Sequence, residues 1–275
     1  MKTVRAKKYL GQHFLRDEDV AYRIASTMSG SELPILEVGP GMGVLTKFLL
    51  QMDRPLKVAE IDTESVSYLK VHYPLLSNNI IEGDFLQMDL SLVFDRKPFA
   101  VIGNYPYNIS SQIFFKILEY KEYIPLCSGM LQKEVAERLA SPPGSKDYGI
   151  LSVFLQAWYD VKYLFTVGRE VFLPPPKVQS GVIILRRNGR TSLGCDEKMF
   201  RRVVKTAFNQ RRKTMRNSLR PLLGPDYPHY SDPIFNKRPE QLGVEDFITL
   251  TLRLTPYILS LQGAESQGNK TCSDL

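Results

Sequence analysis

Gly39, Gly41 and Gly43, in the segment ILEVGPGMGVLT, have the spacing of a ligand-binding turn between a strand and a helix. Glycines there allow a tight turn and let the backbone approach a ligand at the carboxyl end of a parallel strand. The G-x-G-x-G spacing differs from the G-x-G-x-x-G dinucleotide pattern, and Glu37 adds negative charge where a pyrophosphate would lie. The turn therefore favours a ligand with an amino group or a sulfonium centre.

Two further acidic residues follow the next two predicted strands. Glu60 lies 21 residues after Gly39, at the spacing of an acid that accepts hydrogen bonds from ribose hydroxyls. Asp84 can accept a bond from an adenine amino group, and Phe85 stands beside it to contact the ring. Together these residues predict an adenosine pocket. Glu60 alone does not distinguish NAD from S-adenosylmethionine.

A fourth motif follows the fourth predicted strand: Asn104, Tyr105, Pro106 and Tyr107 form the pattern N-x-P-Y. In this pattern the chain resembles amino-methyltransferases that use S-adenosylmethionine and act on exocyclic amines of nucleic-acid bases. The Asn104 side-chain oxygen and the Tyr105 carbonyl can each accept one amine hydrogen, which turns the lone pair towards the methyl group. Pro106 would stiffen the loop, and Tyr107 offers a face for the base to stack on.

A second aromatic ring would help to hold a base that has left its stack to enter such a pocket. Phe172, in VFLPPPKVQSG, is the candidate, because the three prolines that follow would fix its loop opposite Tyr107. The alternative is that Phe172 belongs to the hydrophobic core.

Short apolar runs that alternate with amphipathic segments must position these residues. This alternation predicts a Rossmann-like α/β fold with a mostly parallel sheet covered on both faces. Strand signals stop after Arg187, 188–196 is typical of a linker, and helical spacing over 200–208 and 244–254 predicts a small all-helical domain. We expect domains over 1–188 and 189–262 and a polar tail over 263–275. The predicted strands are 34–39, 56–61, 78–83, 99–104, 125–131, 161–167 and 181–186.

The formal net charge of +7 is unevenly distributed. Residues 1–16 hold five basic and no acidic residues, 199–220 hold eight basic and no acidic residues, and the rest holds 23 basic against 29 acidic. Two clusters without acidic counter-charges favour a nucleic-acid partner over an ordinary solvated helix face. The side chains expected to bind RNA are Lys7, Lys8, Arg211, Arg212, Lys213 and Arg216.

The composition excludes several other classes of protein. A chain of 275 residues with 43% hydrophobic and 24% charged residues is typical of a soluble globular protein, and no membrane span or secretory signal is evident. Cys127, Cys195 and Cys272 form no CxxC pair, and the histidines are scattered, so we expect neither disulfides nor a metal site. The default expectations are a cytoplasmic location and a monomer.

Nine motifs in order extend over nearly the whole chain except the tail: KKYLGQHFL, EVGPGMGVLT, GDF, NYPYNIS, LQKEVAERL, DYGILSV, FLPPPKVQSG, FNQRRKTMRNSL and RPEQLGVEDF. In this set the chain resembles the small-subunit ribosomal RNA adenine N6,N6-dimethyltransferases, the KsgA/RsmA/Dim family. The resemblance implies a methyltransferase domain followed by a helical RNA- or ribosome-docking domain. It also implies that His13 and Leu15 join Gly39, Glu60, Asp84 and Asn104 around S-adenosylmethionine.

The resemblance further implies a reaction. Two adjacent adenosines in a hairpin loop near the 3′ end of 16S ribosomal RNA would each receive two methyl groups within an assembling 30S subunit, with S-adenosylhomocysteine as product. His13 stands where Asn is frequent and Tyr105 where Leu is frequent, but only the Tyr105 backbone is required. The rivals are a large-subunit adenine methyltransferase of the macrolide-resistance type, a non-catalytic assembly factor and an NAD oxidoreductase. The motifs FNQRRKTMRNSL and RPEQL favour the small-subunit class, and the intact N-x-P-Y motif favours an enzyme.

Overall fold

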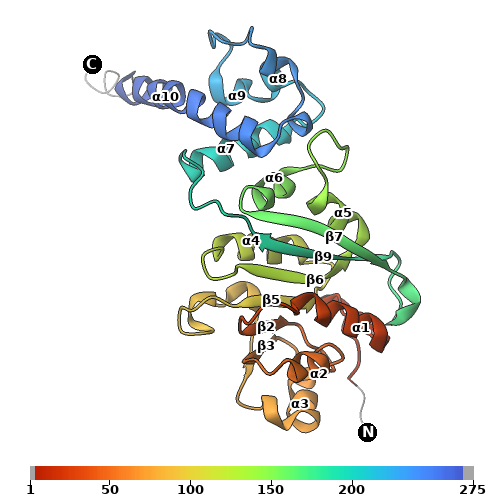
Figure 1. Cartoon of the computed structure of the whole chain (residues 1–275). Helices are drawn as coiled ribbons and strands as arrows, with labels where there is room; N and C mark the ends of the chain where they lie inside the picture. Colours follow the sequence, from red (N-terminus) through yellow and green to blue (C-terminus); the bar gives the residue numbers. More distant parts are fainter. Residues whose placement is uncertain (1–3, 269–275) are drawn as a thin grey trace. The chain divides into compact units, whose positions relative to one another are not determined.

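The computed structural model describes residues 4–268 and the side chains of residues 4–262. The chain divides into two compact units (Figure 1). One contains the chain up to Ala140 together with Trp158–Asn188, and the other contains Ser141–Ala157 and the chain from Gly189 onward. The expected first domain, 1–188, therefore requires a correction at 141–157. The reason is packing, since Phe154 in this stretch lies 6.1 Å from Phe200 of the helical unit, centroid to centroid.

The first unit is built on a seven-stranded sheet in the order β4-β3-β2-β5-β6-β9-β7. The neighbours from β4 to β6 pair in parallel, whereas β9 is antiparallel to both β6 and β7. This arrangement confirms the predicted mostly parallel sheet. The strands are β2 (Ile35–Val38), β3 (Leu56–Glu60), β4 (Ile80–Glu82), β5 (Ala100–Asn104), β6 (Leu126–Gln132), β7 (Tyr159–Val167) and β9 (Ser180–Arg187).

Helices cover both faces of this sheet. α1 (Glu18–Ala25), α2 (Thr46–Leu49) and α3 (Thr63–His72) join one core cluster with alternate residues of the central strands, such as Ile35. The intervening residues, such as Leu36 and Val101, are fully buried as well. Because successive strand side chains point to opposite faces, a second layer must cover them. α4 (Ser110–Glu119) buries apolar side chains such as Phe114, and α5 (Lys133–Ala140) packs on β9.

A two-stranded sheet joins the N-terminal segment to the proline-rich loop. β1 (Phe14–Leu15) is antiparallel to β8 (Phe172–Leu173), with Phe14 opposite Leu173 and Leu15 opposite Phe172. Strands of two residues carry too short a pattern for sequence periodicity to detect. Their pairing nonetheless brings residues 13–15 and the proline-rich loop together.

The second unit is helical, as predicted. Its helices are α6 (Ile150–Gln156), α7 (Glu197–Asn209), α8 (Met215–Ser218), α9 (Arg220–Leu223) and α10 (Val244–Gly268). α7 begins after Asp196, whose carboxylate accepts a hydrogen bond from the Met199 N–H. The helix buries five apolar residues at helical spacing: Phe200, Val203, Val204, Ala207 and Phe208. The last helix, α10, continues into the segment expected to be a polar tail, and residues 269–275 lie outside the described residues. In the described part of the chain, no helix is long and apolar enough to cross a membrane.

Candidate active site

A pocket of about 250 Å³ lies at the carboxyl ends of the central parallel strands. Its walls come from segments that are far apart in the sequence, because the carboxyl ends of neighbouring parallel strands meet at one edge of a sheet. Every predicted cofactor residue and the whole N-x-P-Y motif line this pocket. These residues are His13, Leu15, Glu37, Gly39, Gly41, Glu60, Asp84, Phe85, Asn104, Tyr105, Pro106 and Tyr107.

The glycine turn follows β2 and forms the floor of the pocket. Gly39 and Gly41 have φ angles of +67° and +56°, a left-handed conformation that glycine adopts without steric cost. A Cβ atom on Gly41 would come within 2.9 Å of the Phe14 ring, so glycine is also needed for the close approach of the N-terminal segment. A Cβ atom on Gly39 would meet no atom within 4 Å, which leaves that backbone open to a ligand.

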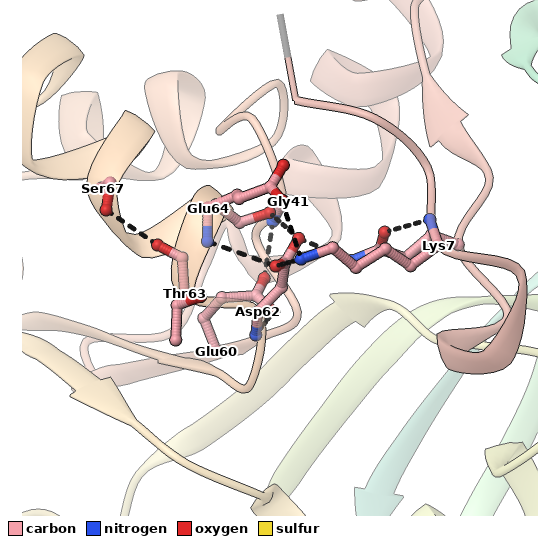
Figure 2. A network of polar contacts seen from close by, with 9 residues as sticks. Lys7, Gly41, Glu60, Asp62, Thr63, Glu64 and Ser67 are labelled. Carbon is pink, nitrogen blue, oxygen red and sulfur yellow. Dashed lines mark hydrogen bonds and ion pairs between the residues drawn. The ribbon is translucent and has the colours of Figure 1, made fainter.

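Glu60 ends β3 and is held by two backbone donors. Its Oε2 accepts from the Gly41 N–H at 3.0 Å and its Oε1 accepts from the Asp62 N–H at 2.9 Å (Figure 2). Burial raises the pKa of Glu60, against the effect of these backbone bonds. Since a carboxylate offers about four acceptor positions, Glu60 keeps acceptor capacity for hydroxyl groups in the pocket.

Glu37 lies deeper than Glu60, with 1% of its surface exposed. Its Oε2 accepts a hydrogen bond of 2.6 Å from the Thr46 hydroxyl at the start of α2. Burial raises the pKa of Glu37 to about 8, so in the chain alone this side chain is mostly neutral at pH 7. Negative charge at this position, inferred from the residue type alone, is therefore favoured only when a cationic group enters the pocket.

Asp84 and Phe85 stand at the carboxyl end of β4. The Asp84 Oδ1 accepts from the Leu86 N–H at 2.9 Å, which fixes the carboxylate at the start of a short helical turn. Phe85 is 5% exposed and presents an apolar edge to the pocket. A fixed acceptor beside an apolar ring is the arrangement predicted for an adenine subsite.

Asn104, the last residue of β5, is oriented by the N-terminal segment. Its Nδ2 donates to the His13 carbonyl oxygen at 3.1 Å. One hydrogen of the amide nitrogen thereby bonds to the protein and fixes the orientation of the amide, and the Oδ1 atom is left to accept a hydrogen bond from a ligand. Sequence reasoning anticipated the acceptor but not the contact that orients it.

The Tyr105 side chain anchors the N-x-P-Y loop to the sheet. The ring is 1% exposed, and its hydroxyl donates to the Ser128 carbonyl oxygen of β6 at 2.7 Å. Gly103 and Gly129 leave room for the ring, since a Cβ on Gly129 would come within 2.5 Å of it. The sequence analysis assigned a role to the Tyr105 backbone only. Gly103 and Gly129, on adjacent strands, were the sequence feature that could have indicated space for a buried ring.

His13, rather than Phe172, supplies the second ring beside Tyr107. The His13 and Tyr107 rings are stacked, with centroids 5.5 Å apart and an interplanar angle of 30°. The His13 Nδ1 lies 2.8 Å from the Pro174 carbonyl oxygen, which ties the ring to the proline-rich loop. Phe172 is 3% exposed and belongs to the core cluster. The expectation of an exposed Phe172 face opposite Tyr107 is therefore corrected in favour of its alternative, a core residue.

Lys7 and Lys8 differ although they are adjacent. The Lys7 ammonium is paired with Asp62 and lies 3.3 Å from the Glu64 carboxylate, whereas Lys8 is exposed. Two acidic partners neutralise the charge of Lys7, so its expected role as a phosphate ligand does not fit this geometry. Lys8 remains available to a polyanion.

The C-terminal basic residues also divide into two groups. Arg211 donates to the Lys146 carbonyl oxygen and lies 3.9 Å from the Glu240 carboxylate, and Arg216 donates to the Tyr230 carbonyl oxygen at 2.7 Å. Arg212 and Lys213 are exposed, and Lys213 lines a shallow hollow with Gln210, Asn217, Arg220, Pro221 and Pro225. Arg211 and Arg216 therefore have hydrogen bonds within their unit, whereas Arg212, Lys213 and also Arg216 are exposed to solvent.

Among residues 4–268, no group of three or more histidine, cysteine, aspartate or glutamate residues could hold a metal ion. The chemistry that these residues offer is acceptance of hydrogen bonds, by two buried glutamates, Asp84 and the Asn104 amide, next to the stacked rings of His13 and Tyr107.

The chain is 62% identical over 270 residues to the ribosomal RNA small subunit methyltransferase A of Bacteroides thetaiotaomicron, covering 98% of this chain and 100% of that protein. It is 64% identical over 253 residues to the protein of the same name from Parabacteroides distasonis, covering 92% of this chain and 95% of that one.

Solved structures share the fold. A dimethyladenosine transferase from Plasmodium falciparum aligns with a TM-score of 0.74 and 24% identity over 89% of this chain and 98% of that one. The 23S rRNA methyltransferase ErmE aligns with a TM-score of 0.62 and 28% identity over 88% of this chain and 99% of that one. The family of ribosomal RNA adenine dimethylases matches residues 3–242. From this match and from the identity to these relatives, the chain belongs to the ribosomal RNA adenine dimethylase family.

Proposed function

We propose that the chain transfers methyl groups from S-adenosylmethionine to the N6 amines of two adjacent adenosines near the 3′ end of 16S ribosomal RNA, and leaves both dimethylated. One observation carries the proposal: the acceptors suited to an adenosine, Glu60 and Asp84, share one pocket with the acceptor suited to an exocyclic amine, Asn104. Relatives at 62–64% identity that are named small-subunit methyltransferase A support the choice of substrate.

The pocket suits a cationic nucleoside cofactor. Gly39 leaves backbone open to a ligand. Burial raises the pKa of both Glu37 and Glu60, and a positive ligand in the pocket would counter this effect by stabilising their charged forms. Glu60 would accept from the ribose hydroxyls, and Asp84 from the adenine amine with Phe85 against the ring. When bound, S-adenosylmethionine supplies a sulfonium methyl group that is electrophilic, and S-adenosylhomocysteine is the product. The proposal includes no metal.

The chain's own contribution to the reaction is to orient the amine. An aromatic amine is a poor nucleophile because its lone pair is delocalised into the ring. In the first transfer the Asn104 Oδ1 and the Tyr105 carbonyl accept hydrogen bonds from its two N–H groups and turn the lone pair towards the methyl group. In the second transfer the monomethylated amine has one N–H group, which donates to one of these two acceptors. Tyr107, backed by His13, supports the base. The proton is lost from a cationic product, so no side chain has to act as a strong general base.

A large-subunit methyltransferase is the second candidate, because the structure of ErmE aligns over 88% of the chain. The identity to that protein is 28%, against 62% and 64% to proteins named for the small subunit. The small-subunit assignment is therefore preferred. An NAD oxidoreductase is disfavoured by the glycine spacing, and a purely non-catalytic factor by the intact N-x-P-Y loop.

We further propose that the protein acts as a monomer in the cytoplasm, on RNA within an assembling 30S subunit. The exposed Lys8, Arg212, Lys213 and Arg216 are the side chains best placed to contact phosphates. Contacts of this kind give affinity without sequence specificity, so the choice of nucleotide must come from the pocket.

The function is tested by supplying the protein with labelled S-adenosylmethionine and ribosomal subunits that lack the modification. We expect label to enter small subunits and not large ones. Transfer to large subunits alone would favour the ErmE-like alternative, and binding of small subunits without transfer would favour a non-catalytic factor.

A further inference from the structure

Residues 7–15 cross the cofactor pocket and contact both of its functional sides. Tyr9 to Leu15 line the pocket. On the glycine-turn side, the Phe14 ring approaches Gly41 so closely that a Cβ there would clash. On the amine side, the His13 carbonyl accepts from the Asn104 amide and the His13 ring stacks on Tyr107. We call residues 7–15 the N-terminal strap.

The start of the strap is held at one buried carboxylate, that of Asp62, while its end pairs with β8 through Phe14 and Leu15. The Asp62 side chain has no exposed surface and accepts hydrogen bonds from the Lys7 ammonium, from the Gln12 amide at 3.2 Å and from the Ser65 hydroxyl at 2.9 Å. The backbone N–H of Lys7 also donates to the Gln12 Oε1 at 2.8 Å, so the two strap residues that bind Asp62 are bonded to each other. Figure 2 shows Lys7 reaching across to Asp62 and Glu64.

The same aspartate supports the acid proposed to bind the ribose. The Asp62 N–H donates to the Glu60 Oε1 at 2.9 Å, so the strap and Glu60 share one anchoring residue (Figure 2). Burial alone would raise the pKa of Asp62, but the bonds from Lys7, Gln12 and Ser65 lower it below its usual value. A buried carboxylate held in the charged form loses much of its stabilisation when its cation is removed.

We propose that Lys7 is a positioning residue of the methyl-transfer site, which fastens the N-terminal strap to Asp62 and thereby closes the cofactor pocket and orients Asn104. The inference rests on the proposed function. It replaces the RNA contact expected of Lys7 from charge alone. Loss of the Lys7–Asp62 pair loosens the start of the strap, so the pocket loses part of the wall formed by residues 9–12. His13, whose carbonyl accepts from Asn104, is then held mainly by the β1–β8 pairing and by its contact with Pro174, and Asn104 is oriented less firmly.

The test compares Lys7→Met with Lys8→Met, which removes an equal charge from the exposed neighbour, and with Lys7→Arg, which keeps the cation. Calorimetry gives the Kd of S-adenosylhomocysteine, and assays on small subunits give KM for S-adenosylmethionine and kcat. We expect Lys7→Met to raise Kd and KM about tenfold or more, Lys7→Arg to restore both to within about threefold, and Lys8→Met to leave Kd unchanged. Equal effects of the two methionine variants on subunit binding, with Kd unchanged in both, would overturn the proposal.

The pairing itself is tested in an Asp62→Asn background. If Lys7 acts through the Asp62 charge, Lys7→Met costs less cofactor affinity there than in the parent chain. An equal cost in both backgrounds would show that Lys7 acts elsewhere.

Hydrogen exchange separates this inference from the proposed function. Amides of residues 9–12, which lie before β1, should exchange faster in Lys7→Met than in Lys8→Met, whether or not RNA is methylated. Equal exchange in the two variants would contradict the fastening role even in an active enzyme. Conversely, faster exchange together with an inactive parent chain would contradict the proposed function alone.

Discussion

At the scale of single residues, the site depends on groups whose other hydrogen bonds are already committed. Asn104 donates to His13, and Glu60 accepts from two backbone N–H groups, so each presents a fixed acceptor to the pocket. Such groups need little reorganisation when a reaction begins. The residue types and their order were readable from the sequence. Their orienting partners were not, since the Asn104 partner stands 91 residues away in the chain.

Replacement of Asn104 tests the amine-orienting role. We expect Asn104→Ala to lower kcat by at least about a hundredfold, because one of two acceptors for the amine hydrogens is removed. The affinity for S-adenosylhomocysteine should stay within about tenfold, since the lost group acts mainly on the amine. Single-turnover methylation and calorimetry measure the two quantities, and full activity of the variant would refute the assigned role.

Glu37 gives a prediction about pH. Its pKa rises from 4.5 to about 8 on folding, so the folded chain holds the proton more tightly than the unfolded chain. The associated stability is fully present below pH 4.5 and is lost as pH rises to about 8, by about 1.4 kcal/mol for each pH unit of that interval. Glu37→Gln removes this titration. The unfolding free energy of the variant should therefore rise relative to that of the parent chain as the pH increases from 5 to 8.

Urea unfolding at pH 5, 6.5 and 8 measures this difference. The exposed Glu32 provides the control, because Glu32→Gln should shift stability by a similar amount at all three pH values. A constant difference between Glu37→Gln and the parent chain would contradict the assignment.

At the scale of elements, the long periodic segments were predicted well and the short ones were missed. All seven strands of the main sheet lie where apolar runs occur. The signal is clearest in the central parallel strands β2 and β5, because buried parallel strands must be apolar on both faces. β1 and β8 have two residues each and owe their pairing to tertiary contacts, so no local pattern reveals them. The error over Phe172 has this origin, since its burial follows from the pairing with Leu15.

The loop that follows α7 gives a prediction about RNA binding. Replacing the exposed Arg212 and Lys213 by glutamine should weaken binding to small subunits and flatten its salt dependence, because fewer counterions are released. Arg211→Gln is the matched comparison. It should leave the salt slope nearly unchanged and lower the unfolding temperature, because Arg211 bonds to Lys146 and Glu240 within its own unit. Filter binding over a salt series measures the slopes, and identical slopes for both variants would argue against this division.

At the scale of the whole molecule, the net charge of +7 is the sum of basic and acidic regions that suit different ligands. Outside the two basic segments the chain has more acidic than basic residues, and the pocket contains three of those acids: Glu37, Glu60 and Asp84. Acidic side chains suit a cationic cofactor, and the exposed lysines and arginines suit RNA. Composition alone indicated the polyanion but not that Lys7 is used internally, because an ion pair across 55 residues is invisible to a charge count.

The central claim is the site and the product of methylation, and one measurement tests it most directly. Small subunits lacking the modification are incubated with the protein and S-adenosylmethionine, and the RNA is then digested and mapped by mass spectrometry. We predict N6,N6-dimethyladenosine at two adjacent positions near the 3′ end of 16S ribosomal RNA, and none after reaction with Asn104→Ala. Methylation at any other position, or a product that stops at one methyl group per adenosine, would contradict the proposed function.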